Sequence, residues 1–247
     1  MKDFSNKYIF IYATVLVLVV AAVLATTATL LKPFQIKNVN TEKVQNLLAA
    51  INVEASFDEA ETLYKEYFKE ELGINKEGNV VDVYNVAEGK MVEGTERPFA
   101  IDVKKQQSLL KEGQDVVFPL YVYEKDGQKG YVIPLQGAGL WGDIWGNIAL
   151  ASDFNTVVGV NFDHAGETPG LGAEIENPSF QSQFVGKHLF VDGEMKPVAV
   201  MKVGQKPLNG AEYVDAVSGG TITSKGVQDM IENSLLPYNA FLNSIVK

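Results

Sequence analysis

One stretch near the N-terminus constrains this chain more than any other, because residues 8–31 carry no charged side chain. The run holds 24 residues, from Tyr8 to Leu31, between Lys7 and Lys32. A helix of that length would span roughly 36 Å, enough to cross a hydrocarbon core of roughly 30 Å. A cleaved signal peptide is the alternative, but its apolar stretch is usually about 7 to 15 residues. The length therefore predicts a retained transmembrane helix over residues 8–31.

The charges beside this run indicate its orientation only weakly. Lys2, Lys7 and the α-amino group stand on one side, and Lys32 and Lys37 on the other, which is a nearly balanced count under the positive-inside rule. A short tail is easily left in the cytoplasm. We therefore expect residues 1–7 to form a cytoplasmic tail and the bulk of the chain to lie outside.

Composition excludes several classes of protein. The formal net charge is −10, with no cluster of Lys and Arg, so we expect no nucleic-acid partner. Cysteine is absent, which excludes disulfides, thiolate nucleophiles, zinc–thiolate sites and cysteine-held iron–sulfur clusters. The two histidines, His164 and His188, are far apart in sequence, and we predict no metal site from them. Any redox work must therefore use a bound cofactor of another kind.

Helical patterns dominate the segment after the apolar run, so residues 32–115 are interpreted as a helical stalk and a variable region. Ser56 and Glu59 form a capping box, and Asn40 or Thr41 can cap an earlier helix. Residues 88–113 are mixed and charged and indicate little. The predicted elements are a short helix from Asn40 or Thr41 to Ile51, an amphipathic helix from Phe57 to about Leu72, and a strand from Asn79 to Val86.

From Val116 the pattern becomes that of β-strands, and residues 116–247 are predicted to form a separate domain. Asp126-Gly127 favours a hairpin turn, because both residues tolerate the required dihedrals. There is no β-α-β alternation, so we predict an α+β fold with an antiparallel sheet and flanking helices. The predicted elements are strands over 116–124, 128–136, 144–152, 157–163 and 197–203, a short helix over 179–185, and a helix from Ser224 that breaks at Pro237.

Three segments contain more glycine and aromatic residues than ordinary turns require: Gln136 to Gly146, Gly166 to Gly172, and Asp215 to Ser224. The first can be a glycine-rich loop with an aromatic anchor, and the second a tight surface turn, since Pro169-Gly170 suits the middle of a type II turn. The third precedes a helix, where free amides favour an anion such as phosphate, although Ser, Thr and Gly are also what any helix start prefers. The residues alone leave ligand site and ordinary turn open.

A family resemblance changes that balance. Ser218-Gly219-Gly220-Thr221-Ile222-Thr223 resembles the (S/T)-G-A-T-x-(S/T) motif of FMN-binding domains that carry the flavin through a phosphoester to threonine. Together with Gly139-Leu140-Trp141 and Gly166 to Gly172, the chain resembles the family of C subunits of sodium-translocating NADH:quinone reductases. The resemblance implies that Thr221 is the modified residue, with Thr223 as the nearby alternative. Gly220 departs from the motif, because alanine stands there in the family.

The resemblance also implies a function and a complete site. The chain would relay electrons through covalent FMN within a membrane complex that oxidises NADH, reduces quinone and exports sodium, and it would have no turnover alone. Its partners would be the other subunits, the lipid bilayer and a flavin transferase. It would be a single-pass protein of the inner (cytoplasmic) membrane with its bulk on the periplasmic or outer side. The residues implied around the flavin are Leu140, Trp141, Glu167, Thr168, Leu171, Gly172, Ser218, Gly219, Gly220, Thr221, Ile222 and Thr223.

Two alternatives share part of this pattern. G-type subunits of Rnf ferredoxin:NAD electron-transport complexes have the flavin motif and the anchor. The longer segment between anchor and β-rich region, together with Gly139-Leu140-Trp141-Gly142, favours the quinone reductase. The alternative from another class is a membrane-anchored protein that binds an anionic ligand at the Ser218 to Thr223 helix start without covalent flavin.

Overall fold

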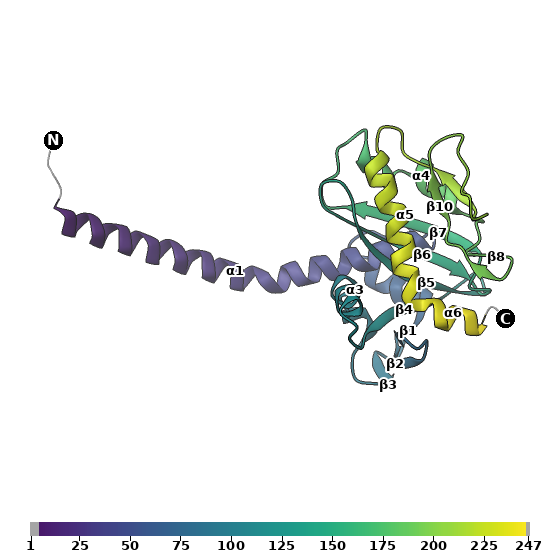
Figure 1. Ribbon diagram of the computed structural model, residues 1–247. Coiled ribbons are helices and arrows are strands. Elements are labelled where there is room, and N and C mark those ends of the chain that lie inside the picture. The colour runs from purple at the N-terminus through teal and green to yellow at the C-terminus, as the bar shows by residue number, and fades with distance from the viewer. Residues whose placement is uncertain (1–4, 246–247) are drawn as a thin grey trace. The chain divides into compact units, whose positions relative to one another are not determined.

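The computed structural model describes residues 5–245, and residues 1–4 of the expected cytoplasmic tail lie outside that range. The chain divides into two compact units, Met1–Lys43 and Val44–Lys247. The described part of the first consists of helix from Asn6 onward, and the second holds a β-sheet with helices on both faces (Figure 1). The α+β prediction, with one long apolar helix before an antiparallel sheet, is therefore confirmed.

Helix α1 (Asn6–Ala50) contains the whole apolar run of residues 8–31. Within residues 5–245 it is the one helix long and apolar enough to cross a bilayer, and residues 5–40 are all exposed in the isolated chain. Thr26 and Thr29 donate their hydroxyl hydrogens to the carbonyls of Ala22 and Ala25 at 2.8 Å, so these polar groups are satisfied within the helix as an apolar surrounding requires. The short helix expected from Asn40 or Thr41 has no start of its own, because those residues continue α1.

The sheet of the second unit has seven strands in the order β3-β2-β1-β4-β5-β6-β7, with every neighbouring pair antiparallel. Asp126 and Gly127 both have positive φ, 52° and 72°, and they form the predicted two-residue hairpin turn between β4 and β5. The strands are β1 (Phe68–Asn75), β2 (Val80–Asn85), β3 (Lys90–Glu93), β4 (Val117–Lys125), β5 (Gln128–Ala138), β6 (Asp143–Ala151) and β7 (Val157–His164).

The helix expected from Phe57 to Leu72 is wrong at both ends. Helix α2 covers only Ala60–Tyr67, and the chain enters β1 at Phe68. Ser56 donates its hydroxyl hydrogen to the carboxylate of Glu59 at 2.5 Å, so the capping box does not form in the expected way. Phe68 is fully buried with its ring 6.3 Å from that of Tyr121 on β4, and this contact with a distant strand overrides the local helical pattern.

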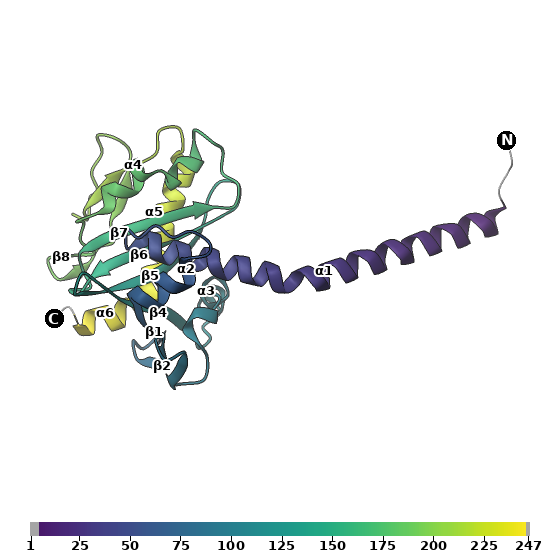
Figure 2. The same cartoon turned by 180° about the vertical axis from the view of Figure 1, so that it is seen from behind.

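Helices cover both faces of the sheet, as the two opposite views show (Figures 1 and 2). Helix α5 (Thr221–Leu235) packs on one face, where Val227 and Ile231 join Ile133 and Ile148 in the larger core. The other face is covered by α2 and by residues 44–51, whose Leu47, Leu48 and Ile51 are fully buried. Burial of each such side chain stabilises the folded state by about 1.5–3 kcal/mol.

The segment predicted as a stalk therefore supplies part of this unit, since residues 44–51 and strands β1 to β3 all fall within residues 32–115. The domain boundary expected near residue 116 has strands of the same sheet on either side of it. The sheet pairs β1 directly with β4, for example Leu72 with Leu120. Helical periodicity alone did not reveal this pairing because the partners are far apart in sequence.

The remaining elements connect these layers. The helix expected over 179–185 is present as two short turns, and the strand expected over 197–203 is shorter and pairs in parallel with β11. A break at Pro237 separates α5 from a last helix, as predicted. These elements are η1 (Pro98–Ala100), α3 (Val103–Lys111), η2 (Gly172–Glu176), α4 (Pro178–Gln181), η3 (Ser182–Phe184), β8 (Phe190–Val191), β9 (Glu194–Met195), β10 (Ala199–Met201), β11 (Tyr213–Asp215), η4 (Leu236–Tyr238) and α6 (Asn239–Ile245).

Candidate functional site

A single buried carboxylate, that of Glu167, joins the three glycine-rich segments. Its Oε1 accepts the backbone N–H of Trp141 at 2.8 Å, and its Oε2 accepts the hydroxyl hydrogen of Thr223 at 2.5 Å. Glu167 is only 4% exposed and lies on the loop between β7 and η2. Segments that are 26 and 56 residues away from it in sequence therefore meet at one side chain.

Two glycines allow this close approach. A Cβ on Gly139 would lie 2.5 Å from Oε1 of Glu167, and a Cβ on Gly172 would collide with Oε2 of Glu167 and Oγ1 of Thr223. Gly170, two positions before Gly172, has φ of 76°, and the N–H of Leu171 donates to the carbonyl of Thr168 at 3.1 Å. This is the type II turn predicted from Pro169-Gly170.

Glu167 stays ionised although it is buried. Burial by itself would raise the pKa of Glu167, but hydrogen bonds from Thr223 and from the backbone of Trp141 and Leu140, with His164 nearby, lower that pKa below its ordinary value. An anionic carboxylate is the better acceptor for these donors, because hydrogen bonds to a charged group are roughly twice as strong as neutral ones. The site therefore contains a negative charge held by neutral donors.

The two candidate threonines have opposite surroundings. Thr221 is exposed and is the first residue of α5. Thr223 is 2% exposed, and its hydroxyl is used by Glu167. A group as large as FMN can reach an exposed hydroxyl, whereas modification of Thr223 would require the Glu167 hydrogen bond to break. This difference favours Thr221 as the acceptor.

The start of α5 is shaped by Gly219 and Gly220. Gly219 has φ of 75°, and a Cβ there would lie 2.6 Å from Cδ2 of Leu171. The N–H of Val217 donates to the hydroxyl of Ser224 at 3.0 Å, which fixes the turn. Gly220, at the N-cap, offers no side chain to the first turn, where no acidic residue stands either. The amide groups here favour an anionic ligand.

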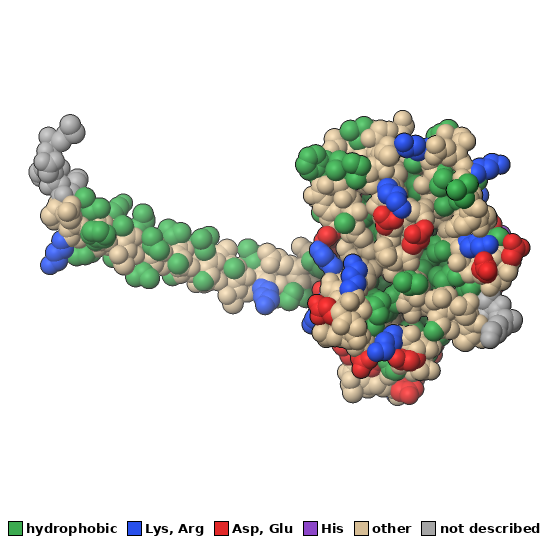
Figure 3. Space-filling view, viewed as in Figure 1, with side chains coloured by type: hydrophobic (Ala, Val, Ile, Leu, Met, Phe, Trp, Pro, Cys, Tyr) green, Lys and Arg blue, Asp and Glu red, His purple; other side chains and the backbone are tan. Residues whose placement is uncertain are grey.

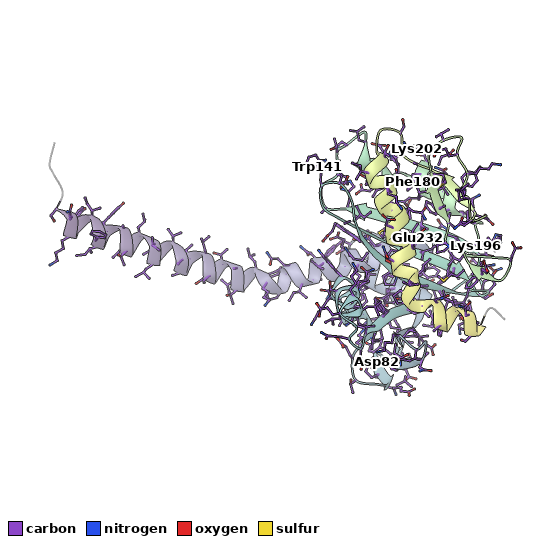
Figure 4. The ribbon with its side chains drawn as sticks, in the orientation of Figure 1. Asp82, Trp141, Phe180, Lys196, Lys202 and Glu232 are labelled. Carbon is purple, nitrogen blue, oxygen red and sulfur yellow. The ribbon has the colours of Figure 1, made fainter. Side chains whose placement is uncertain are left out.

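Large apolar side chains remain exposed around this position. Leu140 is 47% exposed, Trp141 68%, Leu171 44% and Ile222 58%. Trp141 lies beside the N-terminal end of α5 (Figure 4), and hydrophobic side chains gather on the surface in the same part of the domain (Figure 3). Side chains of this size exposed next to one another indicate a binding surface. Thr168 and Ser218 are also exposed here, so the structure brings the candidate residues of all three segments together.

His164 contacts this cluster and Glu176 contacts His164, although neither was predicted as a site residue. His164 accepts the N–H of Glu167 on Nδ1 at 3.1 Å, and its Nε2 lies 3.3 Å from Oε1 of Glu176. The sequence signal for His164 was its position, because it ends β7 only three positions before Glu167.

A cavity of about 510 Å³ lies between α3, β5 and α5, and none of the candidate residues lines it. The candidate site is thus an open surface beside α5.

Comparison with known proteins agrees with this geometry. The FMN-binding domain family matches residues 139–236, which include the candidate site residues of all three segments. The C subunit of a Na(+)-translocating NADH-quinone reductase from Vibrio anguillarum is 33% identical over 233 residues, covering 92% of this chain and 89% of the relative. The corresponding C subunit from Neisseria meningitidis is 34% identical and covers 96% and 94%.

The chain belongs to the family of C subunits of Na(+)-translocating NADH-quinone reductases.

A crystal structure of the C subunit from Parabacteroides distasonis supports the same family in three dimensions. It has a TM-score of 0.73 and 46% sequence identity, and the match covers 86% of this chain and 96% of that one. Family membership and the long apolar α1 together make this chain a membrane-anchored member of the family with an FMN-binding domain.

Proposed function

We propose that this chain is the electron-transfer subunit of a sodium-translocating NADH:quinone reductase and that it carries FMN in phosphoester linkage on Thr221. When bound, FMN can accept and release one or two electrons. The observation that carries the proposal is the contrast between exposed Thr221 and buried Thr223 beside the Glu167 junction. Within the complex, this relay would contribute to NADH oxidation and quinone reduction coupled to sodium export.

The residues around Thr221 fit the chemistry of FMN. The amides at the start of α5 suit its phosphate, and Gly219 and Gly220 let the backbone come close. Leu140, Trp141 and Leu171 supply an apolar surface for a flat ring system. Thr168, Gly172, Ser218 and Ile222 belong to the same segments and are proposed to border the flavin.

The proposal also gives the membrane orientation and the partners of the chain. Residues 8–31 would cross the inner membrane, residues 1–7 would lie in the cytoplasm, and the FMN-binding domain would lie on the periplasmic or outer side. A covalent bond prevents loss of the flavin by dilution there. The other subunits would deliver and remove electrons, and a flavin transferase would attach the FMN. The chain alone would have no turnover, because NADH and quinone would react at the other subunits.

The first prediction tests the attachment residue. Thr221→Val should abolish covalent flavin and leave the fold intact, since the replacement is nearly isosteric and Thr221 is exposed. Thr223→Val should lower the free energy of unfolding by about 2 kcal/mol, because it leaves a buried carboxylate without one donor, and should reduce flavin loading only in part. The chain would be produced together with its flavin transferase, and in-gel flavin fluorescence under denaturing conditions would be measured.

Wild-type protein made without the transferase is the matched control for non-covalent flavin. Persistent in-gel fluorescence in the Thr221 variant would move the attachment to another residue. An intact mass of the wild type that lacks the FMN increment would favour the alternative of an anionic-ligand-binding protein.

A further inference from the structure

His164 stands between the candidate flavin site and a second acidic group. Its ring is 15% exposed and connects Glu176 on η2 to the backbone of Glu167 in the turn over residues 166–172. The Glu167 side chain in turn holds Trp141 and Thr223. A continuous path of hydrogen bonds therefore leads from His164, through the turn, to the other two segments of the site.

The direction of these hydrogen bonds fixes the protonation state of the ring. The backbone N–H of Glu167 can only donate, so Nδ1 of His164 must accept and carry no proton. The remaining proton then lies on Nε2, which faces Oε1 of Glu176 at 3.3 Å. A ring that gains a second proton has N–H groups at both nitrogens, and Nδ1 then opposes the N–H of Glu167.

We propose that His164 is a positioning residue of the flavin site, whose neutral ring holds the turn over residues 166–172 in place and whose protonation releases that turn. The proposal rests on the proposed function for its link to FMN. The contact between His164 and the turn involves only residues of this chain and can be tested without FMN. Imidazole groups in general change charge between about pH 5 and 8, and this sets the range over which the release is tested.

Several carboxylates lie around the ring of His164. Glu167 and Glu176 both interact electrostatically with the ring, and Asp163 precedes it on β7, with its carboxylate accepting the N–H of His164 at 2.7 Å. On neighbouring β6, Asp143 is already paired with Lys104 at 2.5 Å. Burial first, and then the hydrogen bond with Asp163, raise the pKa of Glu176. The ring of His164 therefore faces one backbone N–H on Nδ1 and a carboxylate on Nε2.

Two substitutions distinguish the roles of the two ring nitrogens of His164. The oxygen of asparagine lies near the position of Nδ1, so His164→Asn keeps an acceptor for the N–H of Glu167 and cannot be protonated. The amide of glutamine reaches the position of Nε2, so His164→Gln keeps a partner for Glu176 and loses that acceptor. Glu176→Gln removes the second titrating group. All variants would be made in the full chain in detergent on a Trp145→Phe background, which leaves Trp141 as the single tryptophan.

The measurement is acrylamide quenching of Trp141 fluorescence from about pH 8 to about pH 5, without FMN, across the range in which imidazole titrates. The background protein should show a one-proton rise in quenching as pH falls. His164→Asn should lose the transition and stay at the high-pH level, and His164→Gln should lose it and stay at the low-pH level. Glu176→Gln should keep the transition with its midpoint moved to lower pH. A transition that persists in His164→Asn, or disappears in Glu176→Gln, would overturn the proposal.

A second measurement tests whether the turn also positions the flavin. Flavin fluorescence anisotropy of the FMN-loaded chain should fall with the same pH midpoint and become independent of pH in His164→Asn. Anisotropy that stays constant while Trp141 titrates would overturn the positioning role. In-gel fluorescence of the loaded wild type is checked first, so a failure of covalent attachment is recognised separately, and the Trp141 titration still decides whether His164 holds the turn.

Discussion

Two glutamates are buried among the described residues of the second unit, and their carboxylates are stabilised in different ways. Glu71 on β1 is fully buried and faces the guanidinium of Arg97, with Nε to Oε2 at 2.9 Å and Nη2 to Oε1 at 2.5 Å. Tyr64 adds a hydroxyl donor at 2.9 Å. Glu167 is almost as buried, but its donors are a hydroxyl and backbone N–H groups. One carboxylate is bound by a cation and the other by dipoles.

Glu71 therefore belongs to a buried ion pair, whereas Glu167 forms a junction between separate segments. Arg97 clamps Glu71 with two nitrogens and covers the ring of Tyr84 at 4.2 Å, so it fastens the segment before η1 to the sheet. Burial first, and then the nearby charge of Glu71, raise the pKa of Tyr64, which keeps that hydroxyl a donor. Glu167 instead connects its own loop to the loop of Trp141 and to the first turn of α5 through dipoles. Its hold on them therefore depends on its own ionisation.

The largest effect is expected where the cation is removed. Arg97→Leu leaves the buried charge of Glu71 without its counter-charge, and should lower the free energy of unfolding by about 3 kcal/mol. Arg97→Lys keeps the charge but loses the two-nitrogen fork, so its loss should be smaller. Urea unfolding of the full chain in detergent, followed by circular dichroism, gives both values. Equal losses for Leu and Lys would show that the charge contributes little.

A smaller effect is expected at Glu167, and it should depend on pH. Glu167→Gln should cost about 1–2 kcal/mol at neutral pH, because an amide nitrogen then faces one of the donors. The folded pKa of Glu167 is lowered, so its contribution is present above the ordinary glutamate pKa of about 4.3 and disappears as pH falls through the folded value.

Unfolding of wild type and of Glu167→Gln at several pH values between about 7 and 3 tests this sign, since the range spans the ordinary glutamate pKa. The difference between the two proteins should shrink toward acid. A difference that is the same at every pH would mean that Glu167 contributes through its shape and not through its charge.

The smallest effect sharpens the description of the Glu71 cluster. Within residues 5–245, the hydroxyl of Tyr121 is buried and has no hydrogen-bond partner, whereas that of Tyr64 donates to Glu71. Tyr121→Phe should therefore raise the free energy of unfolding by about 1 kcal/mol, and Tyr64→Phe should lower it by a similar amount. The same unfolding measurement compares them. A loss in Tyr121→Phe would reveal a partner for its hydroxyl, such as a buried water.

Local patterns predicted the features that depend on neighbouring residues. The apolar run of residues 8–31 required a helix because of its length, and Asp126-Gly127 and Pro169-Gly170 required turns because of their backbone dihedrals. The strands from β4 to β7 were also recognised in this way. The motif over residues 218–223 carried the family resemblance. Each of these signals lies within a short window of sequence, so no knowledge of distant contacts was necessary.

Local signals were therefore enough to predict the anchor, the antiparallel core and the candidate flavin motif, because the physical causes of these features act within a few residues along the chain. Three features become visible only in the folded protein: Phe68 begins a strand, Thr221 is exposed while Thr223 is enclosed, and Glu167 binds Trp141 and Thr223. Each of these depends on burial or on a hydrogen bond between residues far apart in sequence. Such contacts form when the sheet and α5 pack together, because the donors and acceptors come from separate elements.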